Sequence, residues 1–101
     1  MHESDLAKKM AVRIRLRGGW ARKIAGGPGQ SGLPDIIAGY RGHGIGLEVK
    51  MPGKERNVTV LQQKTLDAMA AAGMVTAVVT TVQQVERIMD KIDKAYERKG
   101  E

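Results

Sequence analysis

The feature that most constrains this chain is the segment 45–50, Ile-Gly-Leu-Glu-Val-Lys, in which apolar and charged residues alternate. Residues i and i+2 of a strand point to the same face, so the alternation predicts a β-strand with one apolar face. That face carries Ile45, Leu47 and Val49. Glu48 and Lys50 then project together from the opposite face, and Pro52-Gly53 ends the strand just beyond them.

A second acidic residue, Asp35, follows Pro34 and stands thirteen residues before Glu48. Two carboxylates can hold a hard divalent cation through oxygen, and an adjacent lysine can act on a bound water or phosphate. Phosphodiester cleavage needs such a set. Each part also has a simpler interpretation: Asp35 could serve only turn formation, and Glu48 with Lys50 could be an ion pair on an exposed strand. Burying two charges at the end of an inner strand is costly without a partner, which favours the metal site.

The remaining pattern predicts a single α/β domain over residues 1–101, a mixed β-sheet flanked by helices in the order α-β-β-β-α-β-α. Glycines separate several of the elements, and residues 26–32 form a glycine-rich loop by composition. The predicted helices span 4–17, 59–72 and 82–97, and the predicted strands span 20–25, 35–41, 45–51 and 74–80. The strands at 35–41 and 45–51 form a hairpin, and the apolar run 74–80 predicts a central buried strand.

Two polar residues stand at predicted helix starts and have two interpretations each. Thr59 and Gln62 fit a capping box, in which the Gln62 side chain folds back to the Thr59 amide. Gln62 could equally face a functional site at the positive end of the helix dipole. Glu3 opens the first helix, where a carboxylate is favoured electrostatically in any protein.

The formal net charge is +6, and the first thirty residues hold seven basic side chains against two acidic ones. This excess predicts a surface that meets a polyanion, although a solvated basic helix has the same composition. Aromatic residues make up only 3% of the chain, which disfavours stacking platforms for single-stranded bases and favours a duplex or branched backbone. Arg13, Arg15 and Arg17 of the first helix are the residues that we expect to hold DNA.

Cysteine is absent, which excludes disulfides and thiolate metal sites. No apolar run approaches the ~20 residues of a membrane span. The polar N-terminal residues do not resemble a signal peptide, so we expect a cytoplasmic protein without a membrane partner.

Taken in order, the motifs resemble the VRR-NUC (virus-type replication–repair nuclease) family of the PD-(D/E)xK nuclease superfamily. The resemblance extends from Glu3 to about Met89. The motifs that carry it are Glu3, the Gly18-Gly19 pair before a strand with Lys23, the run Gly32-Leu-Pro-Asp35, the run Leu47-Glu-Val-Lys50, and Leu61-Gln62 ten residues or so before Gly73. The chain departs from the family at Gly46, where a bulkier residue is usual and where a β-bulge could form.

The resemblance implies a divalent-metal-dependent DNA endonuclease that uses Mg²⁺ or Mn²⁺. Asp35, Glu48 and the backbone carbonyl of Val49 would be metal ligands, and Lys50 would orient or activate the attacking water. Three further residues would lie around this centre. They are Glu3 as an outer acidic residue, Gln62 facing the site, and Lys23 near the scissile phosphate. Stand-alone members of this size are similar to phage and prophage proteins that form dimers, and four-way junctions or flaps are the substrates that the family suggests.

Two other functions fit the same sequence. One is a non-catalytic DNA-binding or interaction module, and the other is an exonuclease or a restriction-type nuclease. Paired cuts need two sites, so we expect a homodimer, which the polar connection 53–58 could allow to form by domain swapping. The apolar residues expected in its interface are Leu61, Leu66, Met69, Val85, Ile88, Met89 and Ile92.

Overall fold

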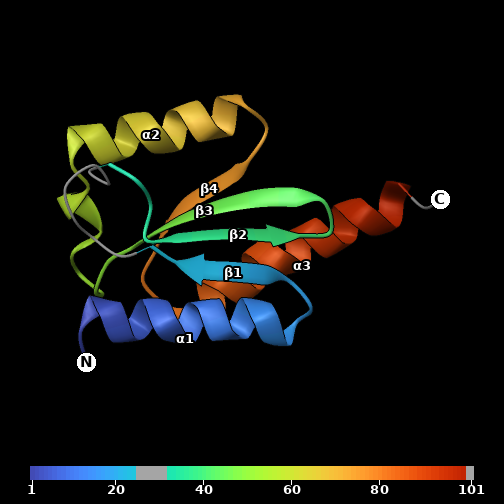
Figure 1. Ribbon diagram of the computed structural model, residues 1–101, viewed down its shortest axis with the longest axis horizontal. Coiled ribbons are helices and arrows are strands. Elements are labelled where there is room, and N and C mark those ends of the chain that lie inside the picture. Colours follow the sequence, from blue (N-terminus) through green and yellow to red (C-terminus); the bar gives the residue numbers. More distant parts are fainter. Residues whose placement is uncertain (25–31, 100–101) are drawn as a thin grey trace.

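A four-stranded mixed β-sheet forms the centre of the protein in a computed structural model, which describes residues 1–24 and 32–99 (Figure 1). The elements follow one another as α1 (Glu3–Leu16), β1 (Trp20–Lys23), β2 (Ile36–Tyr40), β3 (His43–Val49), a 3₁₀ turn η1 (Glu55–Asn57), α2 (Val60–Ala71), β4 (Val75–Val79) and α3 (Val82–Lys99). The predicted element order is therefore confirmed. The expected glycine-rich loop lies outside the described residues, except for Gly32.

The strands lie in the order β1-β2-β3-β4, with antiparallel pairing from β1 to β3 and parallel pairing between β3 and β4. The predicted hairpin is present, since β2 and β3 are joined by the two residues Arg41 and Gly42. Both have positive φ, 49° and 81°, as the favoured two-residue hairpin turn requires. The Arg41 side chain forms an ion pair of 2.8 Å with Asp93. Its guanidinium carbon lies 4.4 Å from the centroid of the Tyr96 ring, and both contacts hold the turn in place.

The expectation of a central strand at 74–80 is wrong. β4 stands at the edge of the sheet and pairs only with β3, and Val75 to Val78 are half-buried. Helices cover the two faces of β4 without covering its outer edge. An apolar run of residues indicates that both faces of a strand are buried. It does not indicate whether the strand has one neighbour in the sheet or two.

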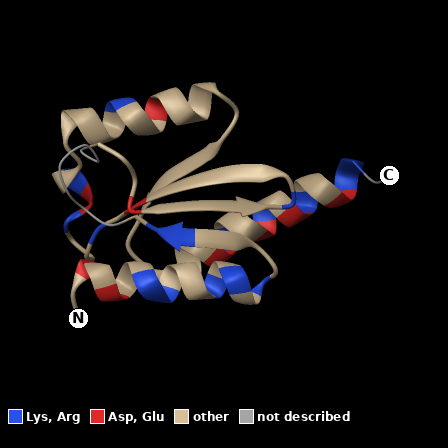
Figure 2. Cartoon of the chain, viewed as in Figure 1, with Lys and Arg blue, Asp and Glu red and all other residues tan. Residues whose placement is uncertain are grey.

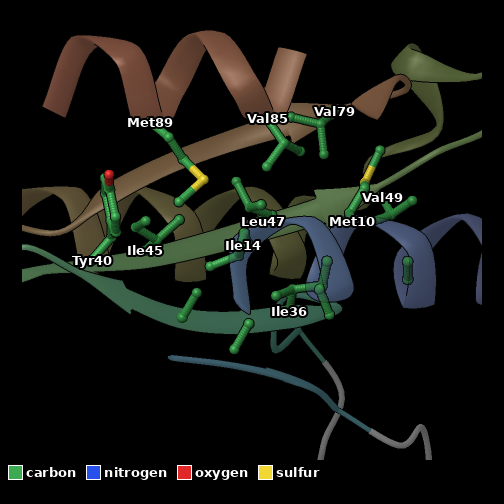
Figure 3. Close-up of a cluster of buried hydrophobic side chains, with 14 of the residues drawn as sticks. Met10, Ile14, Ile36, Tyr40, Ile45, Leu47, Val49, Val79, Val85 and Met89 are labelled. Atoms are coloured by element: carbon green, nitrogen blue, oxygen red, sulfur yellow. The ribbon is translucent and has the colours of Figure 1, made fainter. Parts of the chain in front are cut away.

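The main core lies on one face of the sheet, beneath α1 and α3 (Figure 3). The predicted apolar face of β3 enters this core, and α1 contributes Met10 and Ile14, both with 0% exposure. α3 contributes Val85, Met89 and Ile92. These three α3 residues are therefore packed inside one chain, and Leu66, which belongs to α2, is buried as well. Two unswapped chains could not share these four side chains, whereas Leu61 of the expected interface is 51% exposed. The expected homodimer stays a prediction.

α2 covers the other face of the sheet, and Gly46 is the reason that it can lie close to β3. A Cβ atom at Gly46 would stand 2.5 Å from Cε of Met69 and 3.3 Å from Cγ of Pro34. The register runs without interruption from Ile45 to Val49 against β4, so the strand has no bulge at Gly46. The glycine is a packing requirement and leaves the predicted faces of β3 unchanged. Among the described residues, no helix has the length and apolar character that a membrane crossing requires.

Candidate metal and nuclease site

β3 carries Glu48 and Lys50 into the layer between the sheet and α2. Glu48 is 2% exposed and Lys50 is 9% exposed, although both are charged residue types. The Lys50 ammonium Nζ lies 3.4 Å from the Glu48 carboxylate Oε2. β3 ends at Val49, and a backbone hydrogen bond of 3.0 Å from Lys50 N–H to the Val79 carbonyl extends the pairing with β4 by one residue. Backbone pairing with β4 therefore positions both side chains.

Asp35 joins them from the residue just before β2. Its carboxylate Oδ2 accepts a hydrogen bond of 2.8 Å from the Val49 backbone N–H, and its own carbonyl accepts one of 2.8 Å from Ile24 N–H. Asp35 therefore links the ends of three neighbouring strands. In Figure 2 the red colour of acidic residues marks this end of the sheet, where β2 begins and β3 ends. The structure brings Asp35, Glu48 and Lys50 together, as the spacing predicts.

The surroundings of Glu48 disfavour its ionised form. Burial and, after it, the negative charge of Asp35 together raise the pKa of Glu48 to about 7, and Lys50 opposes the shift. The Glu48 oxygen Oε1 is buried and has no hydrogen-bond partner among the described residues. A buried, unpartnered carboxylate oxygen is costly for a folded protein unless a cation binds there.

The donor set fits a hard divalent cation, which prefers carboxylate and carbonyl oxygens. Within residues 1–24 and 32–99, no three acidic, histidine or cysteine side chains gather into a metal-binding cluster. A cation would therefore need backbone oxygen as well. Continuing the β2–β3 register places Val49 opposite Pro34, which has no N–H to donate to the Val49 carbonyl. This carbonyl is the ligand that the family resemblance implies.

The other expected site residues occupy less central places. Gln62 forms the capping box with Thr59. Its side-chain Oε1 accepts a hydrogen bond of 2.9 Å from the Thr59 backbone N–H, and its own backbone N–H donates one of 3.1 Å to Thr59 Oγ1. Glu3 is exposed in the first turn of α1 and does not complete a three-ligand cluster with Asp35. Lys23 ends β1 opposite Ile36, the residue next to Asp35, so it lies beside the site.

The three arginines of α1 differ in how far they are engaged within the chain. Arg17 donates hydrogen bonds to three carboxylates of α3, at 2.6, 2.9 and 2.8 Å. These acceptors are Glu86, Asp90 and Asp93. Arg15 donates to the Ala21 carbonyl at 2.8 Å, and Arg13 approaches Glu86 at 3.4 Å. The guanidinium of Arg17 thus holds α1 to α3 within the chain, and the expected contact of Arg17 with DNA stays a prediction.

Lys54 and Arg56 are better placed for a polyanion, and sequence reasoning did not assign them a role. Both are exposed in the connection between β3 and α2, at the end of the sheet where β3 ends (Figure 1). The signal was available, since they follow Lys50 within six residues in a polar, charged connection.

Comparison with known proteins supports the fold. No protein-family model matches the chain, and no curated protein matches it significantly. A solved structure described as a VRR_NUC domain matches with a TM-score of 0.65 and 26% sequence identity, over 89% of this chain and 97% of that one.

Proposed function

Because the chain belongs to the VRR-NUC fold family, we propose that it is a divalent-metal-dependent endonuclease that hydrolyses DNA phosphodiester bonds. The observation that carries this proposal is the buried Glu48 oxygen without a partner, beside Asp35 and Lys50. Burial and the neighbouring charge of Asp35 raise the pKa of Glu48 to about 7, and raised carboxylate pKa values of this kind cluster at functional sites, which supports the proposal.

Asp35, Glu48 and the Val49 carbonyl would hold Mg²⁺ or Mn²⁺. Such an ion lowers the pKa of a bound water and stabilises charge on a scissile phosphate. The hydrogen bond from Val49 N–H fixes one Asp35 oxygen, and the other oxygen would be the metal ligand.

Lys50 supplies a positive charge at the same centre. Its Nζ is nearly buried and is oriented by Glu48, so it would orient the attacking water and stabilise charge that develops on the phosphate. Little reorganisation is needed, because Lys50 extends from a paired strand. Gln62 is engaged at the start of α2, so its primary role in this account is to fix that helix over the site.

DNA would lie across the end of the sheet, with Lys23, Lys54 and Arg56 contacting phosphates. Phosphate contacts give affinity and position with little base preference, which favours recognition of DNA shape over a fixed cutting sequence. Branched DNA, such as a four-way junction or a flap, is therefore the proposed substrate. An exonuclease or a restriction-type nuclease is the alternative within the same chemistry, and the cytoplasm is the proposed compartment.

We propose a homodimer, because symmetric cutting of two strands needs two sites. The interface would have to use apolar residues that the fold leaves exposed, such as Val60 and Leu61 on α2, at 74% and 51% exposure. Light scattering at micromolar concentration should report about twice the chain mass. A monomer that cuts four-way junctions symmetrically would contradict the dimer.

A cleavage assay tests the function. Labelled duplex, nicked, flapped and four-way DNA of equal length would be incubated with the protein and Mn²⁺, with EDTA as the control. Internal cuts that require Mn²⁺ and favour the branched substrates are expected. DNA that is bound but left intact with Mn²⁺ would support a non-catalytic DNA-binding module instead.

A further inference from the structure

A groove of about 410 Å³ lies between the middle of α1 and the first residues of α3. It is separate from the Glu48 site, because α1 and α3 cover the core face of the sheet while Glu48 and Lys50 lie on the face that α2 covers. The side chains that give the groove its character are Lys8, Lys9, Val12, Arg13, Leu16 and Val82.

The floor of the groove is apolar and exposed. Val12 is 45% exposed and Leu16 is 75% exposed, and side chains four residues apart on a helix lie next to each other. Leu16 contributes little to the core of its own chain, in contrast to Ile14, which is fully buried. An exposed leucine and valine side by side, with Val82 across the groove, form a surface that another apolar side chain can cover.

The rim of the groove is positive. Lys8, Lys9 and Arg13 line it, and no carboxylate of the described part of the chain does. The nearby acid, Glu86, is already bound by Arg17 at 2.6 Å and by Nε of Arg13 at 3.4 Å, which leaves the terminal nitrogens of Arg13 for a partner. The beginning of α3 adds the positive end of a helix dipole.

We propose that this groove docks an acidic amphipathic helix from a partner protein, with apolar side chains over Val12 and Leu16 and carboxylates toward the lysines. DNA would satisfy the cations but would leave the apolar floor without a counterpart, because a phosphate backbone is polar throughout. A helix in a groove satisfies both. Since the groove and the Glu48 site lie on opposite faces of the sheet, a bound partner would leave the proposed nuclease site open to DNA.

The probe is a synthetic peptide of about 18 residues, long enough to form a helix, with leucine along one face and glutamate elsewhere. Binding is measured by fluorescence anisotropy, and isotope-labelled protein is titrated in parallel to locate the contact by amide shifts. Saturable binding with shifts confined to α1 and the start of α3 is expected. A second peptide with lysine in place of every glutamate should not bind.

Variants separate this site from non-specific attraction to a basic protein. Leu16→Ser and Lys9→Glu should each weaken peptide binding by about tenfold or more, as the loss of a central interface contact does. Lys64→Glu makes the same charge change on α2 and should leave binding unchanged. Equal weakening by Lys9→Glu and Lys64→Glu, no effect of Leu16→Ser, or displacement of the peptide by duplex DNA would overturn the proposal. Because peptide binding is measured without cleavage, its outcome is independent of the nuclease function.

Discussion

Replacing Glu48 with glutamine should stabilise the metal-free protein, which is the opposite of what the loss of an ordinary ion pair does. The folded protein raises the pKa of Glu48 from its ordinary 4.5 to about 7. Each pKa unit corresponds to about 1.36 kcal/mol, so the ionised form costs up to about 3 kcal/mol above pH 7. Losing the contact with Lys50 offsets part of this, and we expect a net gain of roughly 1–2 kcal/mol.

The pH dependence follows from the same shift. Below pH 4.5, Glu48 is protonated in both the folded and the unfolded chain, and it imposes no penalty. As the pH rises towards 7, the unfolded chain loses the proton first, so stability falls through this interval and levels off above it. Glu48→Gln removes this fall. The difference in stability between the two proteins should therefore be small near pH 4.5 and largest above pH 7.

Urea or thermal unfolding in EDTA at several pH values between 5 and 8 measures this difference. The gain corresponds to roughly 5–15 °C in melting temperature for a domain of this size. Glu97→Gln, on the exposed surface of α3, makes the same chemical change and should have no such effect. A Glu48→Gln protein that is less stable than wild type in EDTA at pH 8 would show that Glu48 is a structural partner of Lys50, and would refute the reasoning.

Four variants test the site and the residues that support it. Asp35→Asn should abolish the heat of Mn²⁺ binding in calorimetry while the protein stays folded in EDTA; unchanged Mn²⁺ uptake would place the metal elsewhere. Gly46→Val should cost about 1–3 kcal/mol of stability by overpacking, and Met69→Ala in the same chain should recover part of it; a neutral Gly46→Val would contradict the close packing of α2. Arg17→Ala should lower stability by about 1–2 kcal/mol, since it breaks a network of three carboxylates, and should leave the salt dependence of DNA binding unchanged. Lys54→Ala should lower by about 1 the magnitude of the slope of the logarithm of the DNA-binding constant against the logarithm of the salt concentration. A slope of lower magnitude for Arg17→Ala and an unchanged slope for Lys54→Ala would show that α1 contacts the DNA instead.

The element order could be predicted because local signals were strong. Gly18-Gly19, Pro52-Gly53 and Gly73 mark boundaries that the structure retains, and the Thr59–Gln62 capping box forms as expected. The pairing of the strands was harder to predict from the sequence. The run 74–80 is apolar because helices cover both faces of β4, and its edge position depends on which strands pair, which no local pattern records.

The candidate site divides in the same way. Glu48 and Lys50 share a face by the geometry of any strand, so their meeting could be predicted from spacing alone. The anchoring of Asp35 by Val49 N–H could not, because it depends on how the β2 and β3 ends align. Arg17 shows most clearly what the sequence alone cannot predict. The charge count treats it as a free cation, whereas its carboxylate partners lie on α3, about 70 residues away in sequence.

The most direct test of the central claim is the rate at which Lys50→Ala cuts branched DNA with saturating Mn²⁺, compared with wild type under the same conditions. The account predicts a loss of about 10²–10³ in the single-turnover rate, with unchanged fold and unchanged affinity for the same DNA in EDTA. Wild-type cleavage by Lys50→Ala would show that the cluster of Asp35, Glu48 and Lys50 is not the centre where the phosphodiester bond is broken.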